Sequence, residues 1–142
     1  MPRKNPLPGE IFLSHSSRNE AFTTRLASVL GAHGLNTFYS KKNIQGAQQW
    51  HDEIGSALDR CAWFVVVLSP QSVRSEWVKR EFVYALQQRR YRNRIVPLLY
   101  KTCYSQKLSW TLSSLQYVEF RKDFHQGCRD LLALWKIGYK EK

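Results

Sequence analysis

One carboxylate in this chain has surroundings that suit electrostatic chemistry. Glu81 follows Trp77 by four residues, and on a helix this spacing places both side chains on one stripe. The pKa of a carboxylate held beside an indole ring, partly out of water, can be tuned by its surroundings. The alternative is an ion pair with Arg74, Lys79 or a residue of a neighbouring helix. Either interpretation puts Glu81 at the rim of the helix's buried face.

Two other clusters of reactive side chains are weaker candidates. His15 stands between two serines at the end of a strand, but sequence neighbours there point to different sides and no acidic residue is placed to orient the imidazole. We therefore expect a hydrogen-bonded loop histidine. In His51-Asp52-Glu53, successive helix positions diverge by about 100°, so we expect no metal site.

Cysteine spacing and the familiar nucleotide motifs supply no chemistry either. The three cysteines, Cys61, Cys103 and Cys128, lack metal-ligand spacing, and an odd count argues against a disulfide framework. We predict buried thiols. The chain contains no P-loop and no dinucleotide-binding G-x-G-x-x-G.

The element that must position Glu81 is the apolar run at residues 62–68 with the helix that follows. Seven uninterrupted apolar residues, rich in Val, predict a strand covered on both faces. Ser69-Pro70 ends the strand, and Ser72 or Ser75 caps a helix that we expect to run to about Arg90. Its core-facing stripe is predicted to be Val78, Phe82, Ala85 and Leu86.

The rest of the chain repeats this alternation of strand and helix. We expect strands at residues 10–14, 35–39, 94–100 and 116–120, a first helix ended by Gly31 or Gly34, a second at about 47–60 and a last one over 124–135. Pro97 predicts a position near a sheet margin or a bulge. The order predicts an α/β, flavodoxin-like three-layer fold: a five-stranded parallel sheet of order 2-1-3-4-5 with helices on both faces.

In that fold, ligands bind beyond the carboxyl ends of the first and third strands, so the turns at residues 14–19 and 69–75 should converge near Glu81. We expect a lead-in segment at residues 1–9, one domain at 10–138 and a tail at 139–142. The start of the chain lacks the apolar segment of a signal peptide and no run could span a bilayer, so we expect a cytoplasmic protein without membrane contact.

The charge balance favours anionic partners. There are 22 Lys and Arg against 11 Asp and Glu, a net charge of +11. The densest cluster, residues 89–94, is expected at the end of the central helix, where cations complement the helix dipole. Nucleic acid is the less favoured partner, because only one aromatic residue interleaves these arginines.

The chain resembles a TIR domain over nearly its whole length. Three segments carry the resemblance: Ile11-Phe-Leu-Ser-His-Ser; Ile44-Gln-Gly46 with Trp50; and Leu68-Ser-Pro with Ser72, Ser75, Trp77 and Glu81. The third is the most specific, because Ser-x-Trp-x-x-x-Glu after an apolar strand is rare by chance. Because it is a single short chain that retains Glu81, the sequence as a whole is most similar to the microbial, NAD-consuming branch of the family.

The resemblance implies an NAD+ glycohydrolase or ADP-ribosyl cyclase of immune or anti-phage signalling, with Glu81 as the catalytic residue and NAD+ as substrate, no cofactor being expected. It also implies binding roles for Phe12, Ser14, Ser16, Trp50, Ser75 and Trp77. Hydrolysis and cyclisation remain open. The alternative is a non-enzymatic scaffold that self-associates through TIR–TIR contacts of the loop from Ser40 to Gly46.

Overall fold

The structure is a computed structural model that describes residues 7–39 and 47–141, with side chains described from residue 51 onward in the second range. Its strands are β1 (Ile11–Ser14), β2 (Thr37–Phe38), β3 (Trp63–Leu68), β4 (Ile95–Leu99) and β5 (Val118–Glu119). Its α-helices are α1 (Glu20–Ala32), α2 (Ala47–Arg60), α3 (Glu76–Leu86) and α4 (Phe124–Ala133). Short 3-10 turns are η1 (Ser17–Asn19), η2 (Ser72–Arg74), η3 (Arg89–Tyr91), η4 (Ser105–Lys107) and η5 (Trp110–Ser114).

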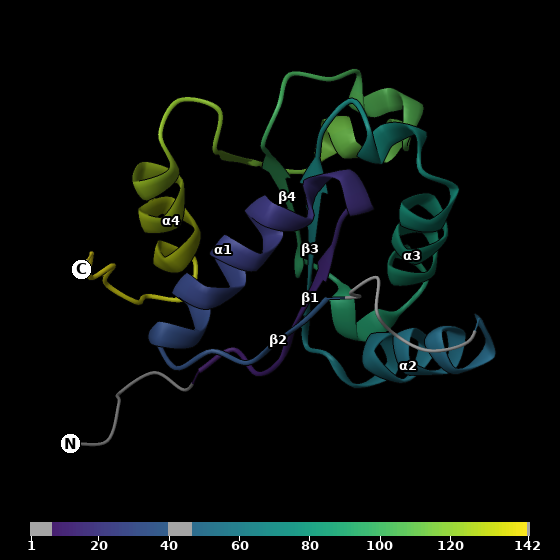
Figure 1. The fold of residues 1–142 in the computed structure, drawn as a ribbon, viewed down its shortest axis with the longest axis horizontal. Helices are drawn as coiled ribbons and strands as arrows, with labels where there is room; N and C mark the ends of the chain where they lie inside the picture. The colour runs from purple at the N-terminus through teal and green to yellow at the C-terminus, as the bar shows by residue number, and fades with distance from the viewer. Residues whose placement is uncertain (1–6, 40–46, 142) are drawn as a thin grey trace.

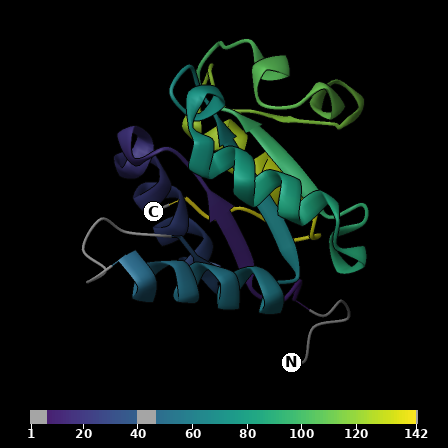
Figure 2. The same cartoon turned by 90° about the vertical axis from the view of Figure 1, so that its right-hand side faces the viewer.

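The five strands form one parallel sheet in the order β2-β1-β3-β4-β5, as the sequence predicts. Figure 1 shows α1 and α4 on one side of the sheet and α2 and α3 on the other. In the view of Figure 2, α2 and α3 lie in front of the strands. The predicted three-layer, flavodoxin-like fold is confirmed.

The central strand β3 feeds two separate cores, because successive side chains of a strand point to opposite faces. Val65 and Val67 pack in the core beneath α1 and α4. Phe64, Val66 and Leu68 pack in the core beneath α2 and α3. Burial on both faces explains why this strand is an unbroken apolar run in the sequence.

Local caps decide where the helices begin and end. Gly34 takes a φ of +85°, and the Leu35 N–H donates to the Leu30 carbonyl, so Gly34 is the residue that ends α1. Ser75 caps α3 and accepts from the Val78 N–H at 3.1 Å. Of the candidates that the sequence left open, Gly34 and not Gly31 ends α1, and Ser75 and not Ser72 caps α3.

The prediction that the central helix runs to about Arg90 is wrong, because α3 ends at Leu86. Leu86, predicted to face the core, is 40% exposed. The chain leaves the helix at Gln88, in an extended conformation, and enters η3, which buries Tyr91 completely. Burying Tyr91 requires a turn that the continued helix would not provide.

Pro97 lies within β4, between two neighbouring strands. Main-chain groups of Arg94 and Tyr100 bond to β3, whereas the Leu99 carbonyl bonds to β5, so even-numbered residues face β3 and odd-numbered ones face β5. Because β5 pairs only with Leu98 and Leu99, Pro97 faces the side on which β5 has not yet begun. Its missing N–H therefore leaves no ladder bond unmade.

The cysteines and the helices of the described residues can be compared with the predictions of buried thiols and of no membrane span. Cys61 and Cys128 are buried free thiols and Cys103 is partly buried. No helix in the described ranges is long and apolar enough to span a bilayer.

Candidate functional site

Glu81 lies on the inner face of α3, where only 4% of its surface is exposed. The Ser14 hydroxyl, at the end of β1, donates a hydrogen bond to Glu81 Oε1 at 2.6 Å. The predicted position at the rim of the buried face is therefore wrong. A carboxylate can be buried this deeply because a neighbouring strand supplies the donor that water would otherwise provide.

Burial dominates the electrostatics of this carboxylate. Removal from water raises the pKa of Glu81 from 4.5 to about 7, while hydrogen bonds from Ser14 and Trp77 act in the opposite direction. The ion pair considered from the sequence is not formed with any described residue. Glu81 is instead a lone acid that titrates near neutral pH, as acid–base and electrostatic catalysts commonly do.

Trp77 and Ser75 flank Glu81 on the same helix. Trp77 is partly buried and packs on the core beneath α3, with the His51 ring edge-on to it at 6.2 Å. Ser75 is partly exposed, and its oxygen accepts from the Val78 N–H. Because that bond uses only the oxygen, the Ser75 hydroxyl proton can still be donated to a ligand.

The turns after β1 and β3 are joined by a buried network of hydrogen bonds. Ser69 Oγ donates to Asn19 Oδ1 at 2.6 Å and accepts from the Ser72 N–H at 3.0 Å. Ser72 Oγ in turn accepts from the Ser69 N–H at 2.9 Å. The predicted convergence of residues 14–19 and 69–75 is thus present, and the network fixes the distance between the two turns.

Sequence reasoning did not single out Asn19 and Ser69 as the residues that lock these turns. The available signal was the spacing of Ser69 and Ser72, because a serine three residues after another can return a hydrogen bond to its main chain. The partner Asn19 lies 50 residues away and carried no local signal.

His15 and Ser16 line the first turn without joining Glu81. His15 is buried, its Nδ1 lies 3.5 Å from the Leu13 carbonyl, and its ring meets Tyr39 edge-on. Burial lowers the pKa of His15, so the ring is neutral at neutral pH. Ser16 caps η1 by accepting from the Arg18 N–H at 3.2 Å. These contacts agree with the expected loop histidine.

Phe12 lies beneath the site and not in it. It is 1% exposed and lies between the rings of Phe38 and Phe64, each with its centroid 5.5 Å away. Phe12 is therefore a residue of the core beneath α2 and α3. The side chain of Trp50 and the loop at residues 40–46 lie outside the described residues.

Comparison with known proteins identifies the family. The family model described as "TIR domain" matches residues 11–132. The chain is 24% identical over 139 residues to the TMV resistance protein N of Nicotiana glutinosa, a match that covers 93% of this chain. This chain corresponds to 12% of the length of the TMV resistance protein N.

Two solved structures share the fold. The TIR domain of the Toll-related receptor TRR-2 from Hydra magnipapillata has a TM-score of 0.67 at 16% identity, covering 88% of this chain and 90% of that one. The TIR domains of the activated Roq1 resistosome that recognises the effector XopQ give 0.69 at 16% identity, covering 88% and 98%. Because the family match extends over most of the sequence, the chain belongs to the TIR domain family.

Proposed function

We propose that this TIR domain cleaves the bond between nicotinamide and ribose in NAD+, the activity that the resemblance to NAD-consuming TIR domains implies. The expected likeness to the microbial branch in particular is not shown, because the curated relative that matches is a plant protein. The observation that supports the proposal is the buried Glu81, held by Ser14 at the carboxyl edge of the sheet. Open parallel sheets bind ligands at this edge, at the point where the strand order reverses. In the order β2-β1-β3, that point lies between β1 and β3.

The reaction needs the ionised form of Glu81 and does not need a proton donor. As the bond to nicotinamide breaks, its electron pair leaves with the ring nitrogen, and nicotinamide departs as a neutral molecule. Positive charge develops on the anomeric carbon of the ribose. An ionised Glu81 beside that carbon stabilises the transition state more than the substrate, because the charge is larger there.

Two outcomes follow from the same step. Attack by water on the anomeric carbon gives ADP-ribose and releases one proton. Attack by the adenine, or by another ribose hydroxyl of the same molecule, gives a cyclic product and also releases one proton. In both cases Ser75 is a candidate donor to a ribose hydroxyl, and Ser16 and Trp77 are candidates for the pocket wall, together with Trp50.

The first test removes the charge of Glu81 and leaves its shape. Glu81→Gln should lower the rate of nicotinamide release by about 100- to 1000-fold, the usual effect of deleting one group that stabilises transition-state charge. Glu76→Gln is the matched control, because Glu76 is an exposed carboxylate in the first turn of α3. Equal rates for wild type and Glu81→Gln would exclude Glu81 as the catalytic residue.

The second candidate function is a non-enzymatic scaffold that acts by homotypic assembly. It is favoured by the likeness to TIR domains solved inside an assembled resistosome. Nicotinamide release and particle size, followed in one concentrated sample with NAD+, distinguish the two. Assembly with no turnover would support the scaffold, and turnover that Glu81→Gln abolishes would support the enzyme.

A further inference from the structure

A second cavity lies at the opposite end of α3 from Ser75. It has a volume of about 270 Å³ and is bounded by the last residues of α3, by η3, by the start of β4 and by Leu115. Figure 1 shows η3 at the lower end of α3, away from the carboxyl edge of the sheet. The cavity therefore belongs to a surface that the proposed NAD+ site does not use.

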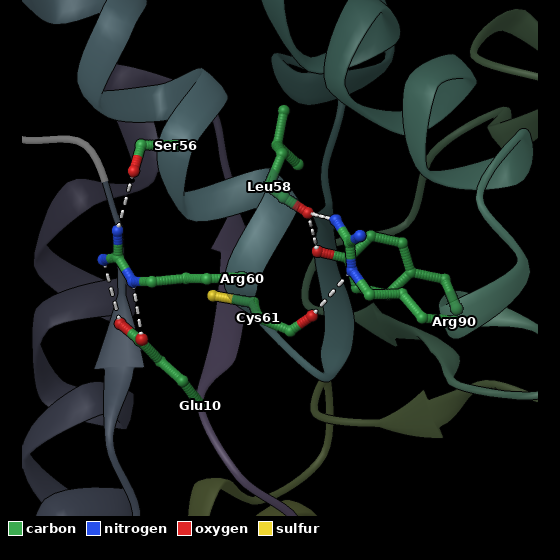
Figure 3. Close-up of polar contacts among 7 residues, drawn as sticks. Glu10, Ser56, Leu58, Arg60, Cys61 and Arg90 are labelled. Carbon is green, nitrogen blue, oxygen red and sulfur yellow. Dashed lines mark hydrogen bonds and ion pairs between the residues drawn. The ribbon is translucent and has the colours of Figure 1, made fainter.

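The inner wall of this cavity is apolar and fixed in place. Ala85 and Tyr91 are fully buried at its base. The Tyr91 hydroxyl donates to the Leu58 carbonyl at 2.6 Å. Arg90 donates to the same carbonyl and, through Nε, to the Cys61 carbonyl at 3.1 Å (Figure 3). The Leu58 carbonyl lies in the last turn of α2, where carbonyls lack helical partners, and Cys61 directly follows the helix. These bonds hold η3 against the end of α2, so the wall is preformed.

The rim of the cavity carries positive charge that forms no ion pair with an acidic group of the described residues. Arg89 and Arg92 line the cavity and are exposed. Within the described ranges, the arginines that form ion pairs are others: Arg60, Arg90, Arg121 and Arg129. Two unpaired guanidinium groups at a preformed cavity favour an anion with several oxygens.

The helix dipole does not account for these two arginines. Two carbonyls of the last turn of α3, those of Tyr84 and Ala85, accept the main-chain N–H groups of Gln87 and Gln88, and the effect of the dipole falls off within that turn. The arginines lie beyond that capped end, in and just after η3. Their charge is therefore available for a ligand.

We infer that this cavity binds an aromatic phosphate monoester of about mononucleotide size. The apolar base would cover a flat ring, Gln88 and Asn93 at the wall offer amide groups to the ring's edge, and the two guanidinium groups would bind the phosphate. The volume of about 270 Å³ lies just below that of pockets for drug-sized ligands, which run from about 300 Å³ upward. One nucleotide unit fits this size better than a dinucleotide or a nucleic-acid strand.

The test uses AMP as the probe with the full 142-residue chain. Amide shifts in a ¹⁵N-labelled sample should change at Gln88, Asn93 and Leu115 on addition of AMP, and ribose 5-phosphate should bind more weakly because it lacks the ring. Arg89→Gln with Arg92→Gln should weaken AMP binding about tenfold, the effect of losing two exposed charge pairs. Arg80→Gln with Lys107→Gln removes the same charge from exposed positions elsewhere and should change the affinity less than twofold.

The outcomes separate this site from the proposed enzyme and from general electrostatics. Binding at η3 that persists in Glu81→Gln supports the inference whether or not the chain cleaves NAD+. Shifts confined to the turns around Ser14 and Ser75 would overturn it, as would equal weakening by the control pair. Equal affinity for ribose 5-phosphate, or tighter binding of a single-stranded oligonucleotide with a steep salt dependence, would also overturn it, the latter in favour of a nucleic-acid surface.

Discussion

The Ser14 hydroxyl donates a hydrogen bond to the buried carboxylate of Glu81. This bond joins β1 to α3 across 67 residues and keeps a buried carboxylate partnered. Without a donor, an ionised carboxylate so deeply buried would be strongly unfavourable. With one, the group titrates near pH 7, and both activity and stability should depend on pH around that value.

The rate of nicotinamide release should decrease below about pH 7. The ionised form of Glu81 is the one that stabilises positive charge, and the pKa of this group is about 7, so kcat/KM should fall about tenfold for each pH unit below it. Ser14→Ala removes a hydrogen bond to the charged form and should move this limb upward by about one pH unit. Ser113→Ala, at an exposed serine that bonds only to a main-chain carbonyl, is the control. A limb at the same pH in Ser14→Ala and wild type would contradict the assignment.

The same carboxyl group should make the fold less stable as pH rises. The pKa of Glu81 is about 7 in the folded chain and near 4.5 when unfolded, so between these values the folded state holds a proton that the unfolded state has lost. The free energy of unfolding therefore decreases with pH across this window. Glu81→Gln should match wild type near pH 4.5 and exceed it by on the order of 2 to 3 kcal/mol at pH 8. Urea unfolding at both pH values measures this, and a variant less stable than wild type at pH 8 would disprove it.

At the scale of elements, helices sit on the sheet at distances set by single residues. Gly127, buried in α4, faces the ring of Phe120, and a Cβ at this position would lie 2.5 Å from that ring. Gly55, in the interior of α2, has nothing within 4 Å of its Cβ position. The two glycines therefore serve different purposes, although both interrupt a helical pattern in the sequence.

Alanine substitutions should separate these two glycines. Gly127→Ala should destabilise the fold by about 1 to 3 kcal/mol, because α4 must move away from Phe120. Gly55→Ala should stabilise it by about 0.5 to 1 kcal/mol, since alanine favours the helix and has room. Thermal unfolding of both variants beside wild type gives the comparison. Similar melting temperatures for the two variants would show that Phe120 and α4 can move apart without loss of stability.

At the scale of the whole molecule, net charge opposes self-association. At +11, copies of the chain repel one another, and the Debye length is about 10 Å at 0.1 M salt. If the proposed enzyme is completed by a second copy, as the TIR–TIR contacts proposed for the loop at residues 40–46 require, activity must depend on overcoming this repulsion.

Specific activity should therefore rise with protein concentration. We expect an increase over two decades of concentration at fixed NAD+, and a further increase when salt is raised moderately, because screening weakens the repulsion between copies. Nicotinamide release per mole of chain is the measurement, with light scattering on the same samples. A constant specific activity in an active preparation would show that one copy forms the whole site.

The sequence by itself determined most of the elements and their order. The apolar run at β3, the caps and the helical spacings are local signals, so the bounds of α2 and the order of the sheet were predicted and confirmed. Gly34 and Ser75 were among the predicted helix caps because capping depends on the residue itself: glycine adopts a positive φ, and a serine side chain accepts a bond from a nearby main-chain N–H. The family resemblance also pointed to Glu81.

Only the tertiary structure decided how that residue is held. Glu81 is buried and not at the rim because Ser14, on another strand, supplies its donor. The helix α3 ends at Leu86 because Tyr91 bonds to a carbonyl in the last turn of α2 and Arg90 bonds to the carbonyl of Cys61, just after α2. The turns after β1 and β3 meet because Ser69 bonds to Asn19. Each of these contacts joins residues at least 29 apart in sequence. Periodicity and capping act over one or two helical turns, so no local pattern could select such partners.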